Sequence, residues 1–313
     1  MLVAVPCAGA DCVVLLDGDD GTERGRIAVG DHPVHLAAVG SAVFVATMGE
    51  RAVSVVDDGR VGKIETGILG PSHFALADGL VLVPCTGGDA VAILDPDSRS
   101  LAGRVGVGAE PHDAAVRDGL AYVGSRVDGT VSVVDPDAAR VKRTIDVGAD
   151  ARVQGVDAGF GAVYAVDQTG GRVVRADETD VTARADVGAN PYEATLGPER
   201  VYVAGRDDGT VTSLAPDLSD PETHGVGGRP TAVSIVDGAP WVLDRERARM
   251  VALDADASLS LPAPAFAADP VGDGDAVAVS HYDDDRVSLV STADREVRWT
   301  AETPAQPFEP LVL

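Results

Sequence analysis

The feature that most constrains this chain is a pattern that returns eight times over its 313 residues, with a period of about 39 residues. Each repeat carries a short hydrophobic segment, which starts 36 to 42 residues after the previous one. A period in this range is typical of propellers and solenoids. The segments are Val3-Ala4-Val5, Val43-Phe44-Val45, Val81-Leu82-Val83, Ala121-Tyr122-Val123, Val163-Tyr164-Ala165, Val201-Tyr202-Val203, Trp241-Val242-Leu243 and Val277-Ala278-Val279.

The fourth repeat shows most clearly what one repeat contains. It holds four short runs, residues 111–116, 120–124, 130–134 and 141–147, of which the last three are rich in β-branched residues. Asp-Gly and Asp-Pro-Asp, which favour tight turns, separate them. Four antiparallel strands in each repeat predict an all-β, eight-bladed β-propeller, in which the hydrophobic segment is the second strand of its blade. Seven blades are the alternative, if the last repeat packs irregularly.

The repeats resemble a known family. The Gly-x-x-Pro lead-in, the "VYV" second strand and the "DGTVSVVD" segment at Asp128 to Asp135 are similar to YVTN-type β-propeller repeats, and Asp208 to Leu214 nearly repeats that last segment. The resemblance covers essentially the whole chain and implies a propeller. It leaves function open, since that superfamily includes surface-layer proteins, YncE-like binding propellers, lactonase-like hydrolases and streptogramin-lyase-like enzymes. An asparagine that commonly ends the second strand in these repeats is absent here.

The composition limits the partners and the setting that we expect for this protein. Against 50 acidic residues there are 25 basic ones, for a net charge of −25, so nucleic acid and anionic membranes are not expected partners. The acidic surface predicts a halophilic host. We expect one domain over residues 1–313. It should be soluble and cytoplasmic, because no secretory segment or long apolar run occurs and the three cysteines are too few for a disulfide scaffold.

The two ends of the chain predict how the propeller closes. The sequence begins on a second strand, whereas Pro307 to Leu313 has the proline and strand of a first strand with nothing after it. We expect this last segment to complete the blade that begins at Met1, which would leave no free edge.

Candidate site residues follow from the first strands, which line the central channel of a propeller. The position two residues after the lead-in proline points inward, and we call it the ring position. In blade order from the first to the eighth, the ring positions are predicted to hold Glu309, His35, His73, Asp113, Val153 (or Gln154), Glu193, Ala232 and Asp269.

Five neighbouring ring positions, from the eighth blade round to the fourth, carry groups that can bind metal. Imidazole and carboxylate are ligands for zinc, iron or manganese, and carboxylates also bind calcium. We therefore predict a divalent-cation site at one mouth of the channel. The ring is also consistent with an acidic, water-filled vestibule. The predicted ligands are His35, His73, Asp113, Asp269 and Glu309, and the residues expected beside them are Cys7, Cys85, His281 and His112.

Two functions remain. The first is a binding propeller that presents its channel mouth to a protein or a small molecule. The alternative is a metal-dependent hydrolase or lyase, with Glu309 or Glu193 as candidate catalytic base. No phosphate-binding loop, dinucleotide motif or nucleophilic-serine motif occurs, so no nucleotide cofactor is expected.

The charge imbalance makes the first testable prediction. Dialysis from molar KCl into 10 mM salt should unfold the protein, because screening of the −25 net charge weakens as the Debye length grows from about 3 Å to about 30 Å. Circular dichroism follows the loss of β-structure. An unchanged spectrum and melting temperature at low salt would contradict a halophilic adaptation.

Overall fold

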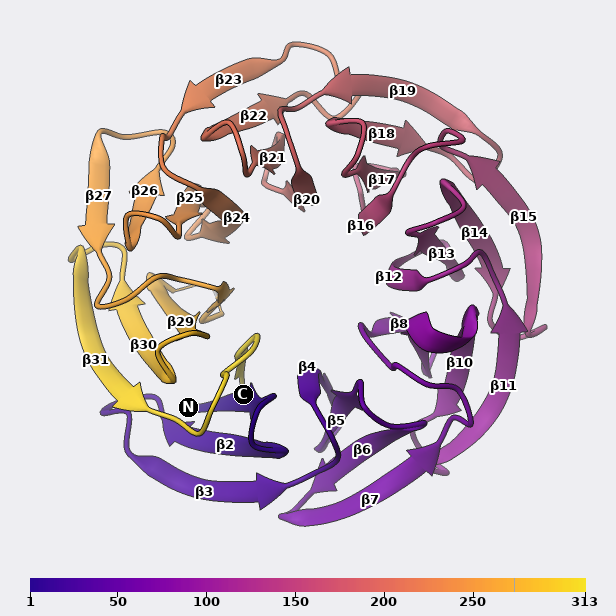
Figure 1. The fold of residues 1–313 in the computed structure, drawn as a ribbon, viewed down its shortest axis with the longest axis horizontal. Coiled ribbons are helices and arrows are strands. Elements are labelled where there is room, and N and C mark those ends of the chain that lie inside the picture. The colour runs from indigo at the N-terminus through magenta and orange to yellow at the C-terminus, as the bar shows by residue number, and fades with distance from the viewer. Residues whose placement is uncertain (273) are drawn as a thin grey trace. The chain divides into compact units, whose positions relative to one another are not determined.

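The computed structural model describes residues 1–272 and 274–313. Over these residues the chain forms eight four-stranded antiparallel sheets, which are the blades of an eight-bladed β-propeller. In seven blades the four strands follow one another in chain order, and in the remaining blade the order is β32-β1-β2-β3 (Figure 1). The eight blades that the repeats predict are confirmed. No helix among the described residues is long and apolar enough to cross a membrane.

The strands recur in the predicted order. The first strands are β32 (Leu311–Val312), β4 (Pro33–Val39), β8 (Ala75–Ala77), β12 (Pro111–Arg117), β16 (Val153–Gly159), β20 (Pro191–Leu196), β24 (Pro230–Val236) and β28 (Ala267–Pro270). The second strands are β1 (Leu2–Cys7), β5 (Ala42–Thr47), β9 (Leu80–Cys85), β13 (Leu120–Ser125), β17 (Ala162–Asp167), β21 (Val201–Gly205), β25 (Ala239–Asp244) and β29 (Ala276–His281).

The third and fourth strands complete the blades. The third strands are β2 (Cys12–Asp17), β6 (Ala52–Asp57), β10 (Ala90–Asp95), β14 (Thr130–Asp135), β18 (Arg172–Ala176), β22 (Thr210–Leu214), β26 (Arg249–Ala252) and β30 (Arg286–Ser291). The fourth strands are β3 (Glu23–Ala28), β7 (Arg60–Glu65), β11 (Ser100–Gly106), β15 (Arg140–Asp146), β19 (Val181–Asp186), β23 (Glu222–Gly225), β27 (Ala257–Ser260) and β31 (Glu296–Glu302). A short 3-10 helix, η1 (Thr86–Gly88), follows β9.

Turn chemistry sets the strand boundaries. Between β12 and β13, Asp118 and Gly119 both have positive φ, 51° and 74°, as a two-residue hairpin turn with the twist of its strands requires. Between β14 and β15, the Asp135 carboxylate accepts a hydrogen bond from the Ala138 N–H at 3.0 Å. The residue types that marked these breaks in the sequence are therefore the ones that form the turns.

The chain divides into two compact units, which we describe separately. Unit 1 comprises Met1–Glu50, Ser54–Lys63 and Val226–Leu313, and unit 2 comprises Arg51–Val53 and Ile64–Gly225. Each has a hydrophobic core built between the sheets of successive blades. In unit 2, Val131 and Val133 of β14 pack in one buried cluster with Val163 and Val174 of the next blade. The single-domain organisation over residues 1–313 stays a prediction.

The C-terminal segment completes the first blade within unit 1, as the sequence predicts (Figure 1). β32 pairs antiparallel with β1, placing Leu311 opposite Ala4. Leu2 and Leu313 exchange both of their backbone hydrogen bonds, at 3.1 and 2.8 Å, and the Phe308 N–H donates to the Pro6 carbonyl at 2.8 Å. The last seven residues therefore hold the start of the chain in a sheet.

Deletion of residues 307–313 should destabilise the protein far beyond the loss of a few surface residues. It removes several backbone hydrogen bonds, each contributing about 1 kcal/mol, and exposes the edge of β1. We expect the melting temperature to fall by on the order of 10 °C. Differential scanning calorimetry in high salt measures it, with Leu313→Ala as the control that keeps the backbone. We call the pairing of residues 307–313 with β1 the clasp. An unchanged melting temperature in the deletion variant would contradict its contribution to stability.

Candidate functional site

A bulge in the first strand positions the ring residues. In blade 4, β12 and β13 shift register just before Ala114, which pairs with Val123, two residues before the end of β13. Asp113, directly before Ala114, stands in this bulge. The first strands of blades 2 and 6 carry the same shift, which places His35 and Glu193 likewise. Bulges re-aim side chains and are frequent beside functional sites.

His35 and Glu309 form a close pair in unit 1. His35 Nδ1 lies 2.6 Å from Glu309 Oε2, and the two side chains are 15% and 46% exposed. Desolvation alone would raise the pKa of the Glu309 carboxyl, but the hydrogen bond and charge of His35 outweigh it, and the pKa falls below its usual value. Glu309 is therefore an ionised acceptor that orients the imidazole. A carboxylate with a low pKa is a weak general base, which counts against the catalytic role predicted for Glu309.

Asp269 lies in a different register from the one predicted. β28 has no bulge, and Ala268 pairs with Val279, two residues before the end of β29. Ala267 therefore occupies the ring position, and Asp269 stands two residues further along the strand, on the same face. The ring positions are predicted by counting from the lead-in proline of each first strand. The eighth blade has no bulge after such a proline, so the count places Asp269 two residues too early.

The contacts of Asp269 are with the C-terminal segment. Its Oδ2 accepts a hydrogen bond from the Val312 N–H at 2.8 Å. Desolvation raises the pKa of Asp269 to about 6, Val312 lowers it, and the charge of Glu309 raises it further. Asp269 thus joins the clasp to the eighth blade rather than reaching the His35 imidazole.

An aromatic cluster surrounds the His35–Glu309 pair in unit 1. The Phe308 ring meets the His35 ring edge-on at 5.1 Å between centroids. It also lies 4.7 Å from Phe266 and 6.0 Å from Tyr282, and the last two rings are 5.0 Å apart. We call Phe266, Tyr282 and Phe308 the aromatic cluster. Aromatic residues make up only 4% of the chain, so three partly exposed rings together are unusual for this composition.

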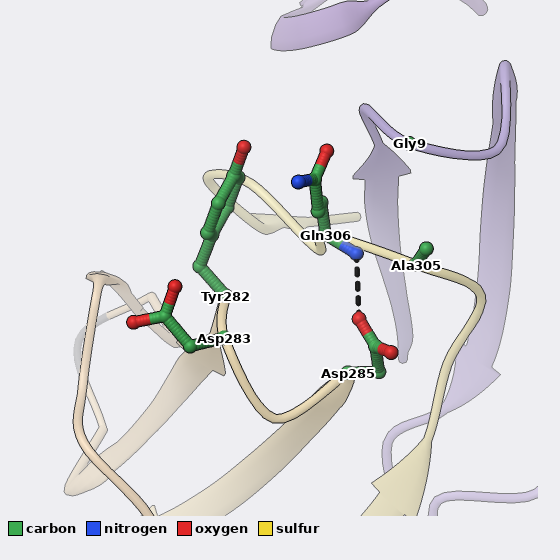
Figure 2. A pocket seen from close by; sticks show the side chains of 6 residues that line it. All are labelled: Gly9, Tyr282, Asp283, Asp285, Ala305 and Gln306. Atoms are coloured by element: carbon green, nitrogen blue, oxygen red, sulfur yellow. Dashed lines mark hydrogen bonds between the residues drawn. The ribbon is translucent and has the colours of Figure 1, made fainter.

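A pocket of about 430 Å³ opens beside this cluster (Figure 2). The Tyr282 ring and the Gln306 side chain project in the same direction, and the Gln306 backbone N–H donates to the Asp285 carboxylate at 2.8 Å. The lining residues are Gly9, Tyr282, Asp283, Asp285, Ala305 and Gln306.

A second pocket, of about 410 Å³, shares Asp283 with the first. Arg245 lines it, pairs with the Asp283 carboxylate at 2.5 Å, and places its guanidinium 5.8 Å from the Phe266 ring centre. Two carboxylates, Asp283 and Asp285, therefore flank Tyr282. The arginine that pairs with Asp283 is Arg245. The other lining residues of the second pocket are Arg229, Glu246 and Pro264.

In unit 2 the predicted ligands His73 and Asp113 are close, and the Asp113 carboxylate accepts hydrogen bonds from the backbone. His73 Nδ1 lies 3.7 Å from Asp113 Oδ1, longer than a hydrogen bond. The Asp113 carboxylate accepts the backbone N–H of Ala114 at 2.8 Å and of Val156 at 2.9 Å. Asp113 therefore fixes the bulge and ties its blade to the next one.

His112 lies at the centre of a polar group in unit 2. Its side chain is buried, and its Nδ1 lies 2.9 Å from the Gln154 carbonyl oxygen. The His112 ring is 4.7 Å from that of His73 and 6.0 Å from that of Tyr192. The Gln154 side-chain nitrogen lies 3.3 Å from both His112 ring nitrogens.

The fifth blade differs from both options that the sequence left open. Val153 is fully buried at the start of β16, and Gln154 packs against His112. Val156 pairs with Ala165, two residues before the end of β17, so Gly155 occupies the ring position. A Cβ at Gly155 would lie 2.7 Å from the Tyr192 carbonyl oxygen. A glycine is needed here because the next blade approaches so closely.

Asp157 is a half-buried carboxyl that the sequence does not single out. It lies two residues beyond the ring position of blade 5, where Asp269 lies in blade 8. Desolvation raises its pKa, and the hydrogen bond from the Ala158 N–H opposes the shift. The strand register could have revealed it, since small residues occupy this position in other blades.

The three cysteines and His281 are buried. Cys7 and Cys12 are cross-strand neighbours without a disulfide, and their mutual hydrogen bond and burial raise the pKa of Cys7 while the bond lowers that of Cys12. Burial raises the pKa of Cys85 to about 12. His281 is buried, its Nε2 lies 3.0 Å from Ser288 Oγ, and burial lowers its pKa. Thiols held protonated are poor metal ligands.

No three metal-ligating groups gather at one point among residues 1–272 and 274–313. The predicted ligands instead form separate contacts. His35 is bound to Glu309 in unit 1, and His73 approaches Asp113 in unit 2. Each pair offers two ligands, where protein sites for transition metals commonly supply three or four.

Comparison with known proteins identifies the fold. No protein-family model matches the sequence, and no curated protein matches it. AztD from Citrobacter koseri is similar in structure, at 15% identity and a TM-score of 0.72 over 99% of this chain and 96% of that one. The dihydro-heme d1 dehydrogenase NirN in complex with DHE matches at 15% identity and a TM-score of 0.78, over 99% and 74%. A streptogramin B lyase matches at 12% identity and a TM-score of 0.61, over 77% and 95%. At such identities the likeness shows a β-propeller and no activity.

Asp269 should make stability depend on pH. Its folded pKa of about 6 exceeds the ordinary value of 3.8, so the folded state binds the proton more tightly. This contribution is fully present below about pH 4 and is lost as the pH rises to about 6. Asp269→Asn should remove that dependence and stabilise the protein at pH 7.5 by roughly 1–3 kcal/mol. Chemical denaturation of both proteins at pH 4.5 and 7.5 measures this, and parallel pH profiles would contradict it.

Proposed function

We propose that this chain is a ligand-binding β-propeller that holds a small cation at the strand ends of unit 1. The observation that carries the proposal is the pocket of Figure 2, where Asp283 and Asp285 flank Tyr282 beside the aromatic cluster. Concave sites with aromatic walls and a few polar groups are the usual form of small-molecule sites. Aromatic faces and carboxylates together favour a positive ligand.

Charge in the two pockets supports this choice. The positive charge of Arg245 offsets the negative charge of Asp283. Two further carboxylates remain, because Glu246 lines the second pocket and Asp285 lines the first. Arg229 is the other basic residue among the lining residues. Within a chain of net charge −25, the surrounding potential also favours a cation over an anion at this place.

A divalent metal ion is the more specific form of the proposal. His35 and Glu309 supply an imidazole and a carboxylate 2.6 Å apart, next to Phe308 of the aromatic cluster. These are ligand types for zinc, iron or manganese, and calcium accepts the carboxylates. A metal bound there would take its other ligands from water or from the bound molecule.

The second candidate function is a metal-dependent hydrolase or lyase at the same place. The observation that favours it is the orientation of an imidazole by an ionised carboxylate, as in catalytic His–carboxylate pairs. In this arrangement His35 would act as the general base, and Glu309 would orient its imidazole ring. Similarity in fold to a lyase supplies no residue for that role.

The repeat type and the setting of the protein belong to the same proposal. The segments Asp128 to Asp135 and Asp208 to Leu214 support a YVTN-type, YncE-like propeller. The excess of acidic residues supports a halophilic cytoplasm. The same excess disfavours nucleic acid and membranes as partners, which leaves small molecules and proteins.

Calorimetric titration in high salt tests the cation. The probes are phenyltrimethylammonium chloride and, separately, the chlorides of zinc, manganese and calcium. Tyr282→Ala should weaken ammonium binding at least tenfold because it removes a cation–π face, whereas Phe160→Ala, an exposed ring outside the cluster, should not. His35→Ala should abolish metal binding, whereas His224→Ala on β23 should not.

The outcomes separate the alternatives. Absence of binding by all four probes would overturn the proposal, as would equal affinities in Tyr282→Ala and wild type for the ammonium probe. Zinc-dependent hydrolysis of γ-butyrolactone that His35→Ala abolishes would favour the enzyme over the binding propeller.

A further inference from the structure

Two arginines lie at the ends of packed strands in neighbouring blades of unit 2, where a Cβ at Gly124 would lie 2.7 Å from Val153 Cγ1. Arg126 follows Ser125, the last residue of β13, and Arg152 precedes Val153, the first residue of β16. The backbone holds both: the Arg126 N–H donates to the Glu110 carbonyl at 3.2 Å, and the Arg152 N–H donates to the Asp167 carboxylate at 3.2 Å. These bonds fix the backbone from which both side chains extend.

The Arg126 guanidinium forms no ion pair with residues 1–272 or 274–313, although the charge of Glu110 lies near it. Its Nε is buried and has no hydrogen-bond partner within the described part of the chain. Burial lowers the pKa of Arg126, and the positive charge of Arg152 lowers it further, while Tyr192 and Glu110 oppose the shift. A half-buried arginine beside a second one is costly unless an anion compensates it.

Further donors face the same place. The Arg206 guanidinium lies 4.0 Å from the centre of the Tyr192 ring. Desolvation raises the pKa of Tyr192, while the nearby charges of Arg206 and Arg126 lower it and that of Glu193 raises it. Tyr192 is therefore a neutral phenol at ordinary pH, able to donate a hydrogen bond. The His112 ring packs edge-on against it at 6.0 Å.

We propose that Arg126 and Arg152, with Tyr192 beside them, bind an oxyanion carried by a small molecule, either a carboxylate or a phosphate. Planar guanidinium groups match the oxygen spacing of both anions and bind them in a bidentate manner. The nearby carboxylates are those of Glu110 and Glu193, and Glu193 is exposed. This site goes beyond the proposed function because all of its residues belong to unit 2.

Calorimetric titration in Hepes buffer at fixed high KCl tests the site, with inorganic phosphate and succinate as separate probes. We expect one or both to bind, and Arg126→Gln and Arg152→Gln to weaken that binding at least tenfold. Arg143→Gln, which removes the same charge from the exposed face of β15, should keep the wild-type affinity. The probe that binds more tightly identifies the oxyanion.

A conservative variant keeps the test decisive if Arg126→Gln fails to fold. Arg126→Lys retains the charge but not the planar group, and it should bind several-fold more weakly with an unchanged circular dichroism spectrum. Wild-type affinity in Arg126→Lys and Arg152→Gln, equal weakening in Arg143→Gln, or no binding of either probe would overturn the proposal. Phenyltrimethylammonium binding should be unaffected in these variants, which separates this site from that of unit 1.

Discussion

The packing of β-branched side chains between successive sheets is the interaction on which the rest of the molecule depends. The second strand of each blade lies inside its sheet with both faces covered, and every residue of β17 and β29 is buried. The fourth strand lies at the outer edge, where β15 buries only Ile145. Strands covered on both faces need continuous apolar runs, whereas edge strands tolerate charge. The fourth strands carry 7 acidic and 10 basic residues, so the excess of acidic residues lies outside them.

The second and third strands of each blade form the buried part of the sheet, and this allows the first strand to be irregular. The bulge before Ala114 leaves Asp113 free of the regular ladder, and its carboxylate instead accepts two backbone N–H groups. The equivalent bulge in blade 2 turns His35 toward Glu309. In β28, which has no bulge, Asp269 is held in the ladder and bonds the C-terminal segment. The ring position thus serves polar contacts in blades 2 and 4, and the position two residues beyond it helps to close a blade in unit 1.

The residue that follows the second strand varies from blade to blade. In unit 1 it is Tyr282 in blade 8, which lines the pocket of Figure 2, and Arg245 in blade 7, which lines the second pocket. In unit 2 it is Arg126 in blade 4 and Arg206 in blade 6. One repeat position therefore presents an aromatic ring or a guanidinium group, depending on the blade. Repeat architectures vary such positions without cost to the core, because the side chains there lie outside the packed sheets.

The sequence by itself determined the repeats, the four strands in each, the number of blades and the clasp formed by the last seven residues. These follow from local rules: alternation of side chains along a strand, turn residues such as Asp118-Gly119, and a spacing that returns along the chain. Only the tertiary structure decided which ring residues touch, that Asp269 lies two residues from its predicted place and that Asp157 is half-buried. It also decided that Phe308 meets Tyr282 and that Arg126 lies near Arg152. Such contacts join segments tens of residues apart, and they depend on strand register and on the close approach of neighbouring blades, which no local pattern encodes.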